Sequence, residues 1–392
     1  MPCLSDGIKR MGFSPLTDQM KIMDTRGTQI QLATRGSDLA LWQANTVKDR
    51  LEQRRISVEL VEVETTGDTI RDELIHRLGT TGAFVRSLDE RVLAGDLDGS
   101  VHSMKDMPTE QPEELVVAGL PRRGPPGDVL VTPAGTALSD LPEGATVGTA
   151  SLRRQAQLRA TRPDLQIEGL RGNVDTRIEK LLAPSLKREA ARRREASESD
   201  SAERDTNSGG DSADEYEQWV NSLPAVKRRA LNRDVDIEYD AICLAEAGLS
   251  RSGLLDHVET QSLPPRSFVP APAQGAIAVT ALDGETAELI HDILDHPPTR
   301  VEVTVERTIL GELGGGCVAP IGVYARLQGA VVTTTVRVLD QTGTEEVVAT
   351  RELPVERHAE AATEFAVDLA DKGAADLIEE AKREQPDGPK RD

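Results

Sequence analysis

One arrangement of residues occurs three times in this chain and sets its fold class. A short apolar strand is followed by a turn of glycine or hydroxyl residues and then by a helix, with the strands expected at 29–34, 146–149 and 165–170. Strands that alternate with helices predict an α/β fold. Each turn also carries arginine, namely Arg35, Arg153, Arg154, Arg171 and Arg177. A helix N-terminus after such a turn offers backbone N–H groups to an anion, although an ordinary capped turn with a surface arginine is the alternative for a single copy.

The charge balance of the chain makes these arginines informative. The 392 residues include 46 basic and 67 acidic side chains, which gives a net charge of −21. Such an excess of acid is typical of proteins built for concentrated salt, and it opposes binding to a polyanion such as nucleic acid. Arginines that recur at helix starts in an acidic chain are expected to meet carboxylates or phosphates. The repetition therefore favours a cleft for an anionic small molecule.

The three cysteines, Cys3, Cys243 and Cys317, are widely separated and odd in number. This pattern predicts neither a disulfide framework nor a zinc site, so no metal is expected, and it fits a reducing, cytoplasmic location. Cys243 lies in an apolar strand pattern and is expected in the core. No apolar run reaches membrane-spanning length and no signal-peptide core is visible. Residues 1–28 are expected to form an N-terminal extension without regular structure.

Cys317 follows three consecutive glycines and precedes Pro320 and Gly322, between a helical pattern and a strand pattern. Glycine permits positive φ and close backbone approach, so a bulky group can reach a thiol in such a loop. The alternative is a tight turn that contains an incidental, inert cysteine. The loop by itself leaves both interpretations open.

Another candidate site follows the short buried strand that begins at Gly99. Lys105 and Asp106 stand at its carboxyl end, before Pro108, where open α/β sheets bind their ligands. An aspartate beside a lysine can transfer protons or stabilise a developing cation, whereas a solvated surface pair is the alternative. His102, within the strand, is expected to pack or to satisfy a buried polar group rather than to bind a metal.

Residues 184–236 differ in character from the rest of the chain. A basic run at 187–194 precedes a segment at 197–215 that is rich in serine and acid. This composition predicts a surface insertion that is largely disordered in its middle. The basic run could bind nucleic acid, but a solvated helix face neutralised by nearby acid fits an acidic chain better. Trp219 and Leu223 are expected to dock the far end.

Stretches rich in proline and glycine mark two crossings between domains. We expect the first domain at 29–123 and 275–298, the second at 124–274, including the insertion, and the third at 299–392. In the third domain, a helix, the Cys317 loop and three consecutive strands predict an antiparallel sheet with helices against one face. The expected fold class is thus two α/β domains and a small α+β domain.

Five motifs stand in order along the chain: Arg35 to Ala44 (RGSDLALWQA), Val101 to Asp106 (VHSMKD), Ser151 to Gln155 (SLRRQ), Leu170 to Arg177 (LRGNVDTR) and Gly315 to Gly322 (GGCVAPIG). Together they resemble the motifs of the porphobilinogen deaminase (hydroxymethylbilane synthase) family. The resemblance covers the chain from about Ile30 to the last helix, and five long motifs in one order are highly specific.

The resemblance implies a transferase of three domains. The first two would fold like periplasmic binding proteins around a cleft, and the third would carry a dipyrromethane cofactor through a thioether at Cys317. The family joins four porphobilinogen molecules head to tail, with loss of ammonia at each step, and releases hydroxymethylbilane for tetrapyrrole biosynthesis. Its members are usually monomers.

Residue by residue, the resemblance implies that Asp106 is the catalytic aspartate, which would stabilise the electron-poor azafulvene left when ammonia departs. It implies carboxylate-binding roles for Arg35, Ser37, Lys105, Thr149, Ser151, Arg153, Arg154, Arg171, Arg177 and Arg307. Porphobilinogen carries acetate and propionate groups, which arginine binds well. Lys105 should help to keep Asp106 ionised.

The chain departs from the family at Thr81 and Arg86, where many members have lysine, and at Ala150, where serine is frequent. The insertion has no counterpart in the shorter members. Two other classes of function stay open. A non-catalytic carboxylate-binding protein of the periplasmic type would need neither Cys317 nor Asp106, and a nucleic-acid binder would leave the arginines of the cleft unexplained.

Overall fold

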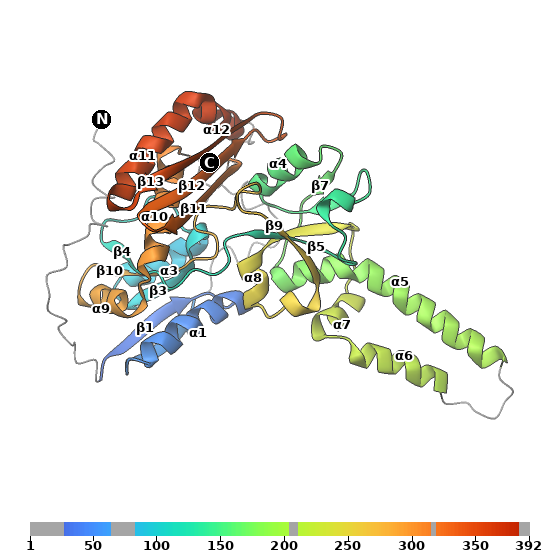
Figure 1. Cartoon of the computed structure of the whole chain (residues 1–392). Coiled ribbons are helices and arrows are strands. Elements are labelled where there is room, and N and C mark those ends of the chain that lie inside the picture. Colours follow the sequence, from blue (N-terminus) through green and yellow to red (C-terminus); the bar gives the residue numbers. More distant parts are fainter. Residues whose placement is uncertain (1–26, 64–82, 204–210, 315–318, 384–392) are drawn as a thin grey trace, which may run out of the picture.

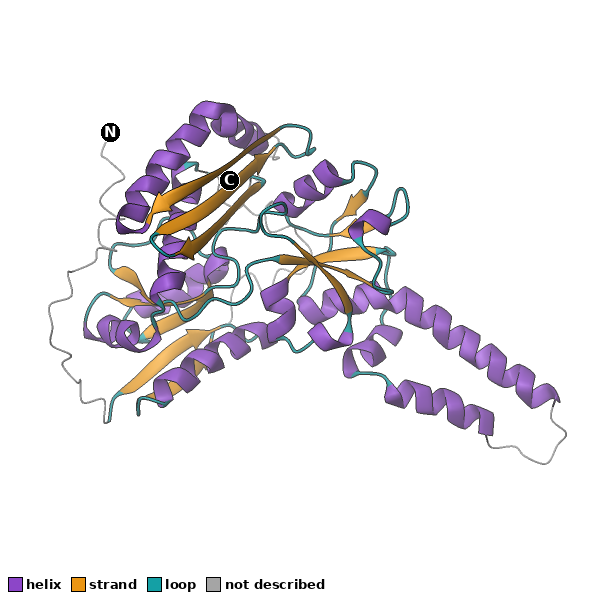
Figure 2. Cartoon of the chain, in the orientation of Figure 1, coloured by secondary structure: helices purple, strands orange, loops and turns teal. Residues whose placement is uncertain are grey.

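The structure is a computed structural model that describes residues 27–63, 83–203, 211–314 and 319–383. The chain forms three β-sheets packed with helices, and a long helical arm extends from one of them (Figures 1 and 2). Two sheets have five strands of mixed direction, and the third has three antiparallel strands. The predicted fold class is confirmed. Within the described residues, no helix is both long and apolar enough to cross a membrane.

The first unit is built on the sheet β2-β1-β3-β10-β4. Its strands are β1 (Gln29–Thr34), β2 (Ser57–Glu62), β3 (Gly99–Ser103), β4 (Leu115–Gly119) and β10 (Ile277–Leu282), and its helices are α1 (Asp38–Glu52), α3 (Ala83–Leu93) and α9 (Glu285–Leu294). β1 pairs in parallel with β2 and β3, whereas β10 is antiparallel to β3 and β4. Leu32, Val279 and Ile290 are fully buried in its core. Because β10 comes from far along the chain, this unit is discontinuous in sequence.

The second unit repeats the plan on the sheet β7-β6-β8-β5-β9. Its strands are β5 (Asp128–Thr132), β6 (Thr146–Gly148), β7 (Gln166–Glu168), β8 (Ala241–Ala245) and β9 (Glu259–Leu263), with helices α4 (Leu152–Thr161) and α8 (Glu246–Arg251). β6 pairs in parallel with β7 and β8, and β5 is antiparallel to β8 and β9. The turns after β1 and β6 are therefore equivalent, and each leads from a strand with parallel neighbours into a helix.

The third unit contains β11 (Ile321–Gln328), β12 (Val331–Leu339) and β13 (Glu346–Pro354), with α10 (Pro297–Glu312), α11 (His358–Leu369) and α12 (Ala375–Arg383). Alternate residues of the strands face the helices and form a core with Phe365 of α11. The expected antiparallel sheet with helices packed against it is confirmed. α11 and α12 are separated by Gly373, whose φ of 99° interrupts the helix and suits glycine.

Glu306 of α10 joins the three units. The chain passes between the five-stranded sheets twice, from β4 to β5 and from β9 to β10. The fully buried Glu306 accepts hydrogen bonds from Arg123 in the first crossing, at 2.8 and 2.9 Å, and from the backbone N–H of Ala273 in the second, at 2.6 Å. It also accepts one from the N–H of Ala325 in β11, at 2.8 Å. One carboxylate thus fixes both crossings to the unit that contains the Cys317 loop.

The arm consists of α5 (Val174–Glu203) and α6 (Asp211–Ser222), and α7 (Ala225–Leu231) returns the chain to the second unit (Figure 1). The expectation of disorder through the middle of the insertion is therefore wrong for 197–203 and 211–215, which are helical; 204–210 lies outside the described residues. The physical reason is that α6 packs back on α5. The guanidinium carbon of Arg193 lies 5.0 Å from the centre of the Trp219 ring, and Arg194 donates a hydrogen bond to the Tyr216 hydroxyl at 2.7 Å.

The basic run of α5 is neutralised by acid, as expected. Lys187 pairs with Asp234 at 2.8 Å, and Arg188 pairs with Glu238 at 2.6 Å. These pairs are largely exposed, so each adds little to the free energy of unfolding. They account for two of the five cations of the run, and Glu189 within the run pairs with Arg192 and Arg193.

Candidate active site

The turn that carries Asp106 lies at the carboxyl end of β3, where the sequence predicts a ligand site. The backbone leaves the sheet as a single 3₁₀ turn, Met104–Asp106. The Met104 side chain is 1% exposed and anchors the turn in the core, whereas Lys105 is half-buried and Asp106 is exposed. The turn therefore presents its carboxylate outward from a fixed base.

Arg307, from α10, holds the same turn from the third unit. Its Nη1 donates to the carbonyl oxygen of Met107 at 3.1 Å, and its Nη2 donates to that of Pro108 at 2.5 Å. Burial lowers the pKa of Arg307 to about 10, so it is still charged at neutral pH. The guanidinium is thus engaged by backbone carbonyls, and the carboxylate-binding role implied for Arg307 stays a prediction.

Two of the expected arginines meet a buried carboxylate of the protein itself. Arg153 and Arg154, in the first turn of α4, are 5% and 6% exposed. Asp128, the first residue of β5, is fully buried and lies 2.8 Å from Nη1 of Arg153 and 2.7 Å from Nη2 of Arg154. Burial alone would raise the pKa of Asp128, but the two guanidinium groups hold it well below its usual range. The cluster keeps an excess of positive charge, because two cations share one anion.

Arginines of the expected binding set have buried donors without an acceptor among the described residues. Nη1 of Arg153 donates to the carbonyl oxygen of Val269 at 2.8 Å, whereas its buried Nε has no hydrogen-bond partner in the described part of the chain. The same holds for the buried Nη2 of Arg171, which follows β7. Buried polar atoms nearly always have partners, so a buried donor without a partner indicates that a bound ligand supplies the acceptor.

Charges of the second unit affect the pKa of Lys105 in the first. Burial lowers its pKa; Asp106 and Asp128 act to raise it, while Arg154 and Arg153 lower it further. The second crossing ties the Asp106 turn to Asp128: Ala276 accepts a hydrogen bond from the N–H of Met104 at 3.0 Å, and Gln274 donates to Oδ1 of Asp128 at 2.9 Å.

Arg177, in the first turns of α5, faces the same region. Burial lowers its pKa to about 10; Arg154 lowers it and Asp106 raises it. Its Nε donates to the carbonyl oxygen of Gly172 at 2.7 Å, which fixes the side chain against its own turn. Asp106 thus lies within the electrostatic reach of a cation from the second unit.

The hydroxyl residues lie at the equivalent turns of the two α/β units. Ser37 caps α1, and its Oγ accepts a hydrogen bond from the N–H of Ala40 at 3.4 Å. Thr149 is 1% exposed, and its Oγ1 accepts from the N–H of Ser151 at 3.2 Å. Ser151 stands at the N-cap of α4, but its hydroxyl is not used for capping. Arg35 is half-buried at the turn after β1.

Cys317 and Thr81 lie outside the described residues. Cys317 belongs to the link between α10, which ends at Glu312, and β11, which begins at Ile321. Its expected position between a helix and a strand is therefore confirmed. The same helix carries Glu306 and Arg307, which contact the crossings and the Asp106 turn.

His102 and Cys243 have structural roles, as expected. Nε2 of His102 lies 2.8 Å from Asp89 and 2.8 Å from Ser100 in a buried cluster. Cys243 is fully buried, and burial raises the pKa of its thiol to about 12. Across the described ranges, His, Cys, Asp and Glu side chains form no group of three that could hold a metal ion.

Sequence reasoning missed Asp128 and Gln274. Gln274 is 1% exposed in the second crossing, and its Nε2 donates to Oδ1 of Asp128 at 2.9 Å. A usable signal for Asp128 is present, because an acidic residue directly precedes the apolar run 129–131. Buried acids need partners, and that requirement could have linked Asp128 to a nearby arginine.

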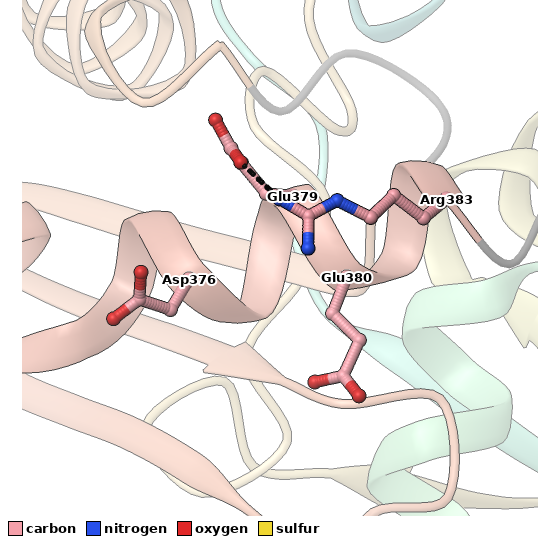
Figure 3. A pocket seen from close by; sticks show the side chains of 4 residues that line it. All are labelled: Asp376, Glu379, Glu380 and Arg383. Atoms are coloured by element: carbon pink, nitrogen blue, oxygen red, sulfur yellow. Dashed lines mark hydrogen bonds and ion pairs between the residues drawn. The ribbon is translucent and has the colours of Figure 1, made fainter.

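A separate hollow of about 510 Å³ lies on α12 (Figure 3). Asp376, Glu379, Glu380 and Arg383 line it, and Arg383 pairs with Glu379 at 2.8 Å. Three carboxylates beside one arginine repel an anionic ligand. This hollow is therefore a poor candidate for the anion site that the arginines indicate.

Two family models match most of the chain. The model described as "Porphobilinogen deaminase, dipyromethane cofactor binding domain" matches residues 30–190 and 225–289, and "Porphobilinogen deaminase, C-terminal domain" matches 300–374. The first match skips the outer part of the arm, where α5 and α6 pack together. The family's shared core therefore includes α7 and excludes most of the insertion.

Curated relatives agree with the family models. A probable porphobilinogen deaminase of Halobacterium salinarum is 53% identical over 91% of this chain and 99% of its own length. The porphobilinogen deaminase of Geobacter metallireducens is 36% identical over 90% of this chain and 94% of its own length. Among solved structures, the ectoine-binding protein TeaA of a TRAP transporter gives a TM-score of 0.32 at 11% identity, over 91% of this chain and 98% of that one. The chain belongs to the porphobilinogen deaminase family, transferases that act on porphobilinogen and bind a dipyrromethane cofactor.

Proposed function

We propose that the charged cluster where the two α/β units meet binds the carboxylates of porphobilinogen and of the cofactor, and that Asp106 is the catalytic group. The observation that carries this proposal is the pair of buried, orphaned donors, Nε of Arg153 and Nη2 of Arg171. The chain has a net charge of −21 and ample acid to satisfy its own arginines. Donors left open in such a chain fit acetate and propionate groups from outside.

The arginines would have different roles in binding, because their existing contacts differ. Arg154 donates from Nε and Nη2 to Asp128 and from Nη1 to the carbonyl of Cys243, so it acts mainly through its charge. Arg153, Arg171 and Arg177 retain donors for ligand carboxylates. Arg35 and Ser37 from one unit, and Thr149 and Ser151 from the other, would complete the binding set.

Asp106 is suited to the chemistry by exposure and by charge. Its carboxylate is exposed beside Lys105, and its charge raises the pKa of Arg177. It can accept hydrogen bonds from the pyrrole N–H of porphobilinogen and stabilise the positive charge that develops there as ammonia leaves. It can also accept the proton lost after each coupling.

The orphaned arginine donors fit a dipyrromethane as well, because its pyrroles bear the same acidic side chains as the substrate. We propose that Cys317 holds this group through a thioether. When bound, the group supplies the pyrrole carbon to which the first porphobilinogen is joined. Lys105 and the arginines would orient its carboxylates, and Asp106 would hold its pyrrole N–H groups.

The three sheets suggest a division of the chain into three domains. We propose the domains as 29–123 with 275–298, 124–274, and 299–392, with the insertion at 184–236 outside the chemistry. The family assignment and the separated cysteines favour a monomer in the cytoplasm. A non-catalytic carboxylate-binding protein would use the same arginines, but the family does not favour it.

Arg171→Gln should raise the KM for porphobilinogen by about 10-fold to 100-fold, because a hydrogen bond to a charged partner contributes about 1.5–3 kcal/mol. Steady-state kinetics that follow product release test this expectation. The matched control is Arg162→Gln, since Arg162 is an arginine already paired with Asp164 at 2.7 Å. An unchanged KM in Arg171→Gln, or an equal rise in the control, would count against the proposed site.

Arg307→Lys should separate positioning from binding. Lysine cannot reproduce the two-pronged donation to Met107 and Pro108, so the turn that carries Asp106 would loosen. We expect kcat to fall by about 10-fold to 100-fold with little change in KM. A rise in KM at constant kcat would instead support the carboxylate-binding role that the resemblance implies.

A further inference from the structure

We propose that Asp128 is a positioning residue for substrate binding, which holds the guanidinium group of Arg153 in the orientation that receives a carboxylate of porphobilinogen and fixes the positive charge of Arg154 beside it. This inference rests on the carboxylate-binding role proposed for those arginines. Asp128 lies outside the five sequence motifs.

The carboxylate of Asp128 bridges the two arginines. Oδ2 lies 2.8 Å from Nη1 of Arg153, and Oδ1 lies 2.7 Å from Nη2 and 3.1 Å from Nε of Arg154. One anion thus fixes two adjacent cations that would otherwise repel each other. The contacts of Oδ1 with Arg154 are charge-assisted hydrogen bonds, whereas the contact of Oδ2 with Arg153 is an ion pair without hydrogen-bond geometry.

Asp128 is itself fixed from behind by groups other than the arginines. Its backbone is paired on both sides, with Ala245 of β8 and with Leu263 of β9. Gln274, from the second crossing, donates to Oδ1 at 2.9 Å. The carboxylate is therefore set by the sheet and the crossing before any ligand arrives.

Removing this anchor would free Arg153 in particular. Its Nη1 would keep only the carbonyl oxygen of Val269, at 2.8 Å, and its Nε is already without an acceptor in the described structure. A ligand would then have to order the side chain as it binds, which weakens affinity. The chemical step at Asp106 would be less affected, because no hydrogen bond joins Asp128 to the turn after β3 among the described residues.

Asp128 also balances the charge around Lys105. The charges that shift the pKa of Lys105, beside its burial, are those of Asp106 on its own turn, Asp128 on β5, and Arg153 and Arg154 on α4. Loss of the Asp128 charge removes one of two carboxylates that raise the pKa of Lys105. Lys105 would then lose its proton at lower pH, and tight binding of carboxylates would end at lower pH.

Two substitutions separate geometry from charge. Asp128→Glu keeps the charge but moves it by one methylene, so KM should rise by about 10-fold while the alkaline limb of log kcat/KM against pH stays in place. Asp128→Asn removes the charge, so KM should rise and the alkaline limb should move to lower pH. If Asp128→Asn does not fold, Asp128→Glu decides alone, and a native KM in Asp128→Glu overturns the proposal.

Asp89→Asn is the matched control, since Asp89 is another buried aspartate, bonded to Ser100, Thr280 and His102 in the first unit. It should lower the thermal midpoint and leave both KM and the alkaline limb unchanged. A rise in KM equal to that of Asp128→Glu would mean general loosening and would overturn the proposal. Arg153→Gln tests the role of the arginine separately from that of Asp128. An unchanged KM in Arg153→Gln defeats the binding role of Arg153. A raised KM in Arg153→Gln together with a native KM in Asp128→Glu defeats only the role of Asp128.

Discussion

Asp106→Asn should fold, bind porphobilinogen and turn it over about 10²-fold to 10⁴-fold more slowly than the native chain. The amide keeps the size of the side chain, and the fold is insensitive to the change because Asp106 is exposed while Met104 anchors the turn. What is lost is the negative charge that stabilises the cation formed as ammonia leaves. The effect should therefore appear in kcat.

One secondary effect must be separated from the loss of catalysis. Asp106 raises the pKa of Lys105 against burial and against the arginines of α4. Without that carboxylate, Lys105 loses its proton at lower pH, so binding weakens first on the alkaline side. Measurement of kcat and KM near neutral pH and below avoids this contribution, because Lys105 is more fully charged there.

Asp96→Asn is the matched control for Asp106→Asn. Asp96 is an exposed carboxylate of the same unit, paired with Arg91 at 2.9 Å, and its removal should leave turnover unchanged. Full activity in Asp106→Asn would overturn the catalytic assignment. It would favour a role for the turn in binding alone.

The fold was largely predictable because its central strands carry strong apolar patterns. β1 has the expected bounds, and the helix starts after β1 and β6 lie where the glycine and hydroxyl turns predict them. β4 and β9 were missed. Both stand at the end of their sheets. The sequence of β9, ETQSL, is polar, as that of a strand with one neighbour can be, whereas β4, LVVAG, is apolar but only five residues long.

The arm shows a different limit of sequence reasoning. Serine and acid in 197–215 favour disorder in isolation, yet residues 197–203 continue α5, a helix that is already anchored in the second unit and packs against α6. Trp219 and Tyr216 hold the arginines of α5 by contacts between segments that are far apart in sequence. Tertiary contacts of this kind override local propensity.

The site was predictable as a set of residue types but not as a set of contacts. The motifs indicate that Arg153 and Arg154 bind carboxylates, and the structure adds that a buried Asp128 holds both. This pairing connects β5 with α4, and the intervening 24 or 25 positions carry no pattern that specifies it. Register and packing decide such contacts, so they emerge only from the folded chain.

Cys317→Ala should abolish turnover and remove a covalent mass from the purified chain. If Cys317 carries the dipyrromethane, the intact mass of the native protein exceeds that of the polypeptide by two linked pyrrole units, and the variant shows the polypeptide mass alone. Without the attached group, the first porphobilinogen has no pyrrole to join. The arginines stay in place, so the variant should still bind carboxylates.

Cys243→Ala provides the control within the same chain. Cys243 is fully buried, and the raised pKa of its thiol, about 12, keeps it from forming the reactive thiolate. The adduct should therefore persist in Cys243→Ala and vanish only in Cys317→Ala. An unmodified mass in native protein made with its pathway intact would make a non-catalytic binding module the better interpretation. An adduct that survives in Cys317→Ala would keep the enzyme but move the attachment to another residue, since glycine and proline around Cys317 would then serve only the turn between α10 and β11.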